Sequence, residues 1–205
     1  MRWKVTGASL LVWVMVSGPG CQPPEPQRAT LIEAVECGDL ADARRHIKGA
    51  ADVNESGEEG WTAMMVAAYQ GDLSMVKMLR KSGANLHATN SAGVTPLMVA
   101  TYNGHADVAR YLLNHGADVN DRTPEGRTPL MIAARSGNFR LIQVLVEKGA
   151  DIRIQDDQGR TVFSELDHNE LISGVNRKDI QEYLDDHGGP LPAPLGKNGQ
   201  DPAPK

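Results

Sequence analysis

The sequence predicts an all-α repeat solenoid of about five units, each a pair of antiparallel helices followed by a hairpin-like loop. The main observation is a Gly-x-Thr step that returns every 33 residues, beginning at Gly60, Gly93, Gly126 and Gly159. Two further glycine series keep the same interval, at positions 38, 71, 104 and 137 and at positions 83, 116 and 149. In composition, 40% of the residues are hydrophobic but only 4% are aromatic, which suits a stack of short helices.

The first helix of each unit is predicted from its capping residues. Thr95 and Thr128 stand where a hydroxyl can accept hydrogen bonds from the unpaired backbone N–H groups of a first turn. Pro96 and Pro129 follow directly, at the helix position where a missing N–H costs nothing. An alanine-rich stretch comes next and ends at the glycines of positions 71, 104 and 137, where a residue without Cβ lets the chain turn tightly.

The second helix of each unit is predicted from apolar residues at helical spacing, as in residues 73–79 and 139–145. The glycines at positions 83, 116 and 149 end it. A polar segment such as residues 116–120 then leads into the loop of the next unit. The expected order is therefore loop, capped inner helix, glycine turn and outer helix.

This order of Thr-Pro-Leu, small residues and glycine turns resembles the ankyrin-repeat family over about 160 residues. The resemblance implies a module that binds partner proteins rather than an enzyme. Inner helices of that family commonly read Thr-Pro-Leu-His, and the histidine takes part in hydrogen bonds between adjacent loops. Met65, Met98 and Met131 stand in its place here. We therefore expect packing to replace that network, with the methionines as core residues rather than a copper or partner site.

Both ends of the array depart from the pattern. The first unit keeps Leu31 and Ala34 in register but fills its second helix with Arg44, Arg45 and His46, as a polar N-terminal cap requires. The last unit holds six extra residues within 167–176, which form either a tolerated loop or a partner contact. Its polar end suits a C-terminal cap.

The first twenty residues are predicted to be a signal peptide. Arg2 and Lys4 precede an apolar stretch over 5–16, and small residues lead to Cys21. This resembles the lipobox of bacterial lipoproteins, which implies acylation of Cys21 and an outer-membrane anchor; the alternative is ordinary cleavage and a soluble periplasmic protein. The predicted organisation is a signal peptide at 1–20, a proline-rich spacer at 21–28, the repeat domain at 29–188 and a disordered tail at 189–205.

The sequence offers no candidate for catalysis, a cofactor or a metal. A net charge of −5 and a pI near 5.7 disfavour nucleic-acid binding. The six histidines fall at unrelated repeat positions, and His115 and His187 are placed to meet the last carbonyls of a helix. Cys37 is interpreted as a small, semi-buried and inert residue. The competing hypothesis is a metal- or redox-active or enzymatic envelope protein that uses Cys37, the histidines or the methionines.

The resemblance places a partner on a concave surface formed by the loop tips and the exposed ends of the inner helices. The residues assigned to this surface are Glu58, Glu59, Trp61, Tyr69, Gln70, Val94, Tyr102, Asn103, Arg127, Arg135 and Arg160. Their charge changes from acidic in the early units to basic in the later ones, which either orients a dipolar partner or is a solvated surface. The expected partner is an exported or envelope enzyme, such as a cell-wall hydrolase; an effector that acts on a host protein is the second alternative.

Overall fold

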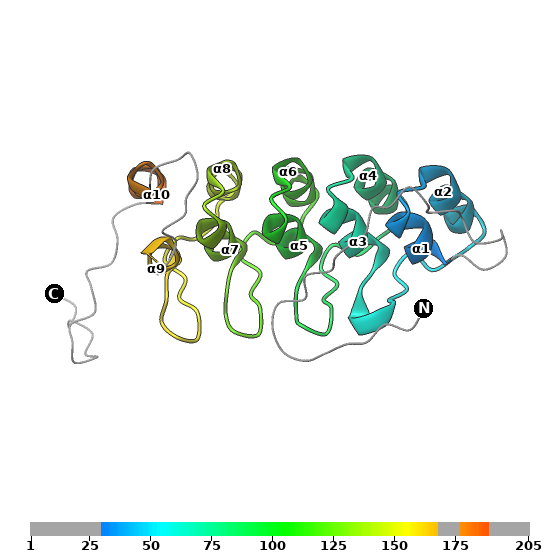
Figure 1. Cartoon of the computed structure of the whole chain (residues 1–205), viewed down its shortest axis with the longest axis horizontal. Coiled ribbons are helices and arrows are strands. Elements are labelled where there is room, and N and C mark those ends of the chain that lie inside the picture. Colours follow the sequence, from blue (N-terminus) through cyan, green and yellow to red (C-terminus); the bar gives the residue numbers. More distant parts are fainter. Residues whose placement is uncertain (1–29, 168–176, 189–205) are drawn as a thin grey trace.

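The structure, a computed structural model, describes residues 30–167 and 177–188. Figure 1 shows two layers of helices stacked along one axis. The inner layer consists of α1 (Leu31–Glu36), α3 (Ala63–Gln70), α5 (Pro96–Tyr102), α7 (Pro129–Ser136) and α9 (Val162–Asp167). The outer layer consists of α2 (Leu40–Lys48), α4 (Leu73–Lys81), α6 (Ala106–Asn114), α8 (Phe139–Glu147) and α10 (Arg177–Gly188). The predicted repeat solenoid is confirmed.

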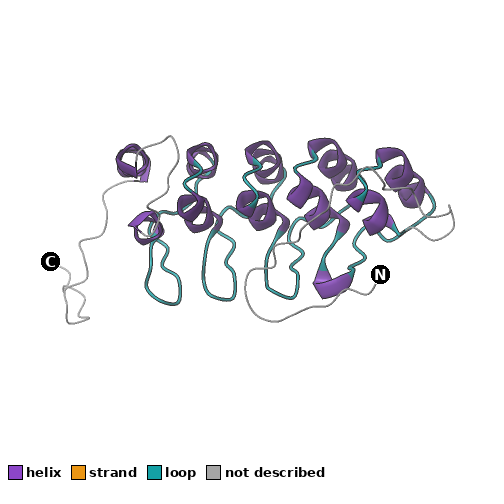
Figure 2. Ribbon diagram, in the orientation of Figure 1, coloured by secondary structure: helices purple, strands orange, loops and turns teal. Residues whose placement is uncertain are grey.

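Long loops hang from the inner layer, one between each pair of consecutive units (Figure 2). The first loop carries a short 3-10 helix, η1 (Glu58–Gly60), and an isolated bridge between Ser56 and Thr62. Backbone hydrogen bonds also join neighbouring loops, where Ser91 N–H donates to the Glu59 carbonyl at 2.8 Å and Asp157 N–H to the Glu125 carbonyl at 3.1 Å. The position between these two donors, 33 residues from each, is Pro124, which has no N–H.

The predicted caps are present at the inner helices. The hydroxyls of Thr95 and Thr128 accept from the backbone N–H groups three residues on, at 3.4 Å in both units, and a proline occupies the first turn after each. Gly71 ends α3 in the left-handed conformation, with φ of 72°. A Cβ on Gly71 would also stand within 2.4 Å of the His105 ring, so the turn into α4 requires glycine for two reasons.

The methionine stripe lies in the core, as predicted. Met65 and Met98 are fully buried and Met131 is 2% exposed. The outer helices cover this stripe with their own apolar faces, for instance through Leu79 and Leu145. Burial of each such side chain stabilises the stack by roughly 1.5–3 kcal/mol.

The expectation that packing alone replaces the loop-to-loop hydrogen bonds is wrong. Other residues link adjacent units: the Asn54 side chain accepts from Asn85 N–H at 2.7 Å, and Asn120 in the same way accepts from Asp151 N–H at 2.9 Å. His105 Nε2 lies 2.8 Å from the Tyr69 carbonyl, which can only accept, so this nitrogen carries the hydrogen. Hydrogen bonds between adjacent units are therefore present without the family's histidine.

The two terminal units are polar on their outer helices. In α2, Arg44 and Arg45 are exposed, and in α10 Asp185 and Asp186 are exposed, which agrees with capping units. No helix in the described part of the chain is long and apolar enough to cross a membrane. The predicted signal peptide, spacer, tail and most of the insertion, residues 168–176, lie outside the described residues.

Candidate partner-binding face

A row of side chains follows the ends of the inner helices at the 33-residue interval. It consists of Glu36, Tyr69, Tyr102 and Arg135, and we call it the palm row. Among the described residues, Tyr102 is the large hydrophobic residue that stays exposed, at 44%. Partial burial raises the pKa of its hydroxyl, although the positive charge of Arg127 acts in the opposite direction. The centre of the row therefore presents an exposed aromatic ring with an arginine nearby.

The acidic end of the face lies in the first two units. Glu58 and Glu59 are exposed in η1 at the loop tip, as predicted. Burial, and then the charges of Glu33 and Glu58, raise the pKa of Glu36 above its ordinary range. Trp61, predicted at the tip, lies instead at the base of its loop, half-buried and edge-on to Tyr69 with ring centroids 6.2 Å apart. This pair forms an aromatic wall beside the carboxylates.

Several predicted contact residues also serve the fold. The Gln70 amide donates to the Glu36 carbonyl at 2.8 Å, and the Asn103 amide donates to the Val99 carbonyl at 2.9 Å. Val94 is half-buried against the core. The side chains of these residues are held by contacts within the fold. They are therefore less free to adjust to a partner than the sequence implies.

The third loop is closed by a small polar cluster. The Thr123 hydroxyl donates to Glu125 at 2.8 Å and accepts from Arg127 N–H at 3.2 Å. The bond from Thr123 is the main reason that the pKa of Glu125 lies below its ordinary value. Arg127, like Trp61, is half-buried at the loop base, and its side chain is directed toward Tyr102 in the preceding unit.

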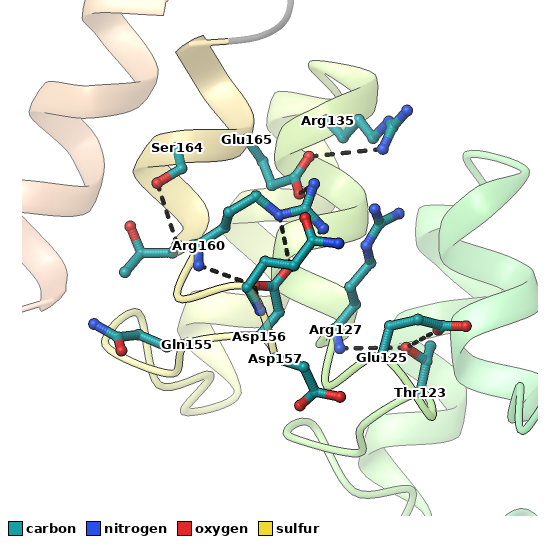
Figure 3. A network of polar contacts seen from close by, with 12 residues as sticks. Thr123, Glu125, Arg127, Arg135, Gln155, Asp156, Asp157, Arg160, Ser164 and Glu165 are labelled. Carbon is teal, nitrogen blue, oxygen red and sulfur yellow. Dashed lines mark hydrogen bonds and ion pairs between the residues drawn. The ribbon is translucent and has the colours of Figure 1, made fainter.

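The basic end of the face is built around a buried ion-pair network (Figure 3). The Asp156 side chain, which is fully buried, accepts Nε and Nη2 of Arg160 at 2.7 and 2.6 Å. Glu165, 2% exposed, lies 3.6 Å from Arg160 Nη1 and 4.0 Å from Arg135 Nη1. Arg160 is thus held inside the protein, whereas Arg135 keeps half of its side chain in solvent.

This network is absent from the sequence-based description, although a signal for it exists. Asn90, Thr123 and Asp156 are spaced by 33, and each side chain accepts a backbone N–H four residues on. The 33-residue spacing of these three polar residues marks the position that closes each loop. The glycines recur at the same interval and are the more conspicuous signal in the sequence. Nothing equivalent indicates Glu165, whose neighbours come from two other segments.

Asp156 predicts an acid-sensitive last unit. Burial opposes ionisation of this carboxyl, but hydrogen bonds from the Arg160 side chain and from the Arg160 and Gln158 N–H groups together hold its pKa below the ordinary value. Its contribution to stability is therefore complete above the unfolded-state pKa near 3.9 and is lost as the pH falls through the folded-state pKa. We expect Asp156→Asn to lower the melting temperature by about 3 °C at neutral pH. The difference in melting temperature between the wild type and the variant should shrink as the pH falls below about 4. A difference that stays constant with pH would contradict this assignment.

A family model that describes three copies of the ankyrin repeat matches the chain over residues 31–123 and again over residues 82–156. The chain belongs to the ankyrin-repeat family. Ankyrin repeats are protein–protein interaction modules and as a rule are not enzymes. No curated protein sequence matches the chain.

The residues of the competing metal or redox hypothesis have structural roles in this ankyrin domain. His115 and His187 each bond the carbonyl four residues earlier, at 2.7 and 2.9 Å, as predicted. Within residues 30–167 and 177–188, no cluster of potential metal ligands occurs. Cys37 is exposed rather than semi-buried. The chain has one other cysteine, Cys21, which lies outside the described residues.

Proposed function

We propose that this ankyrin protein acts in the bacterial envelope, where it binds and regulates another exported protein through its concave face. The observation that carries the proposal is Tyr102, an exposed aromatic ring at the centre of the palm row, with the charge of Arg127 acting on its hydroxyl. Tyrosine, tryptophan and arginine are the residue types that dominate binding energy at protein interfaces. An exported enzyme that is inhibited, protected or scaffolded is the partner class that we propose.

The two ends of the palm row carry opposite charges, which can set the orientation of a bound partner. Glu33, Glu36 and Glu58 concentrate negative charge in the first two units, and Arg135 is half-exposed near the other end. Opposite charges at two ends of a face favour one orientation of a partner over the reverse. We therefore expect the partner to place basic groups near Glu36 and acidic groups near Arg135.

Recovery of a partner from envelope extract tests the proposed face. Arg135→Ala should reduce recovery of the bound protein several-fold, because Arg135 lies on the palm row. Arg110→Ala is the matched control: Arg110 is similarly exposed and also paired with a carboxylate, Glu147 at 2.9 Å, but it lies on the outer layer. Equal loss of the partner in both variants would argue against binding by the concave face.

The proposed location rests on the signal-like N-terminus and Cys21. Acylation of Cys21 through a thioether and a disulfide between Cys21 and Cys37 use the same sulfur, so the two modifications exclude one another. The mass of the N-terminal peptide of the protein isolated from cells distinguishes the anchored lipoprotein from a cleaved, soluble form. An uncleaved N-terminus would contradict export by this route.

A further inference from the structure

A groove with basic walls lies on the outer layer, between α2 and α4, and has a volume of about 400 Å³. Its floor includes Ile47 and Met78, both half-buried. Four cationic side chains line it, two from each helix: Arg44, Lys48, Lys77 and Lys81. All four are exposed, and the groove lies in the layer opposite the hanging loops (Figure 1).

The four cations occupy two equivalent positions of the repeat. Arg44 and Lys77 are 33 residues apart, and so are Lys48 and Lys81. The next two units carry Arg110 and Gln143 at the first of these positions, and Asn114 and Glu147 at the second. The positive charge is therefore confined to one end of the outer layer and is not a general property of this helix face.

The cations of the groove also lack the carboxylate partners that later units provide. Arg110 pairs with Glu147 at 2.9 Å, and Arg140 pairs with Asp107 at 2.7 Å. By contrast, α4 contains no acidic residue, and the acidic residue of α2, Asp42, pairs with Arg45 at 3.0 Å. Within the described part of the chain, no carboxylate forms an ion pair with any of the four groove cations.

We propose that this groove binds the phosphate headgroups of anionic phospholipids and holds the first two units against a membrane surface. Clusters of four or more lysines and arginines are attracted to anionic lipid, and the attraction acts within about 10 Å of the surface. The apolar floor can receive the glycerol and upper acyl portions, while the four cations surround the phosphate. The long lysine side chains allow this arrangement without movement of the backbone.

The position of the groove favours a membrane over an acidic protein. Thr30, at the start of the described chain, follows Cys21 by nine positions, a segment that spans at most about 30 Å when extended. A chain anchored at Cys21 therefore keeps Thr30, where the first unit begins, within that distance of the lipid. This inference rests on the proposed envelope anchor. Acylation is determined separately, from the mass of the N-terminal peptide, so failure of the anchor and failure of the groove are distinguishable.

Acetylation of lysines in the full chain tests the proposal. The protein is reconstituted in vesicles of phosphatidylcholine alone and in vesicles that also contain phosphatidylglycerol. We expect acetylation of Lys48, Lys77 and Lys81 to fall several-fold in the anionic vesicles and to recover at high salt, because salt shortens the range of the attraction. Lys148, exposed after α8, is the internal control and should react equally in both. Equal acetylation of the groove lysines in the two vesicle types would overturn the proposal.

Charge-reversal variants distinguish protection of the lysines by binding in the groove from general shielding of lysines near a membrane. Lys77→Glu combined with Lys81→Glu should abolish the protection of Lys48, whereas Lys148→Glu should leave it intact; unchanged protection in the double variant would overturn the assignment. Circular dichroism establishes that both variants keep their helices. Protection of the same lysines by soluble polyglutamate but not by phosphatidylglycerol would also overturn it, since the groove would then belong to an acidic protein segment.

Discussion

Replacing Tyr102 with alanine is expected to weaken binding of the partner by about 30-fold, which corresponds to the loss of about 2 kcal/mol at an interface hot spot. Tyr102 is the last residue of α5 and remains 44% exposed, so its removal takes little from the core. Binding buries the ring, and alanine removes both its apolar area and the hydroxyl on which the charge of Arg127 acts. Titration calorimetry with the recovered partner measures the change.

Tyr102→Phe divides this effect into its two parts. Phenylalanine keeps the ring but removes the phenolic hydroxyl on which the charge of Arg127 acts. We expect it to recover most of the affinity if ring burial dominates, and the melting temperatures of the three proteins should agree within a few degrees. Unchanged affinity in Tyr102→Ala would place the partner elsewhere on the molecule.

Replacing Met98 with alanine is expected to lower the free energy of unfolding by about 2–5 kcal/mol. Met98 is fully buried in α5, the central inner helix, which packs against both α3 and α7. Because stability in a repeat stack is the sum of units and of interfaces between neighbours, a cavity at the centre weakens two interfaces together. Urea denaturation should therefore show a lower midpoint and a broader transition.

Met98→Leu is the matched control for the cavity. Leucine conserves the volume, and such exchanges usually cost less than about 1.5 kcal/mol. The comparison isolates the packing role of the thioether side chain from any chemical role of its sulfur. A leucine variant as unstable as the alanine variant would show that the sulfur itself matters at this position.

Local chemistry explains which parts of the fold were predictable. The Thr95 and Thr128 caps depend on residues within a few positions of one another, and the buried methionines keep one fixed place in every unit; both predictions are confirmed. The order of helices follows from these signals because every unit repeats the same local solution.

The parts that escaped prediction depend on side chains from neighbouring units. The sequence gives no sign that Glu165 is buried against Arg160 and Arg135, or that His105 bonds the Tyr69 carbonyl. Trp61 and Arg127 were predicted at loop tips but lie at loop bases, where the chain enters the inner helix. Which of the predicted face residues contact a partner stays a prediction.

Pro124 has a mechanical consequence for the concave face. The bonds from Ser91 to Glu59 and from Asp157 to Glu125 clip the first loop to the second and the third to the fourth, and the proline removes the corresponding clip between the second and third. The row of loops thus consists of two pairs, each joined by a backbone hydrogen bond. The boundary between the pairs, which we call the seam, has no such bond among the described residues. Tyr102 and Arg127 belong to the two units that meet at this seam, so the central aromatic ring stands where the described loops share no backbone hydrogen bond.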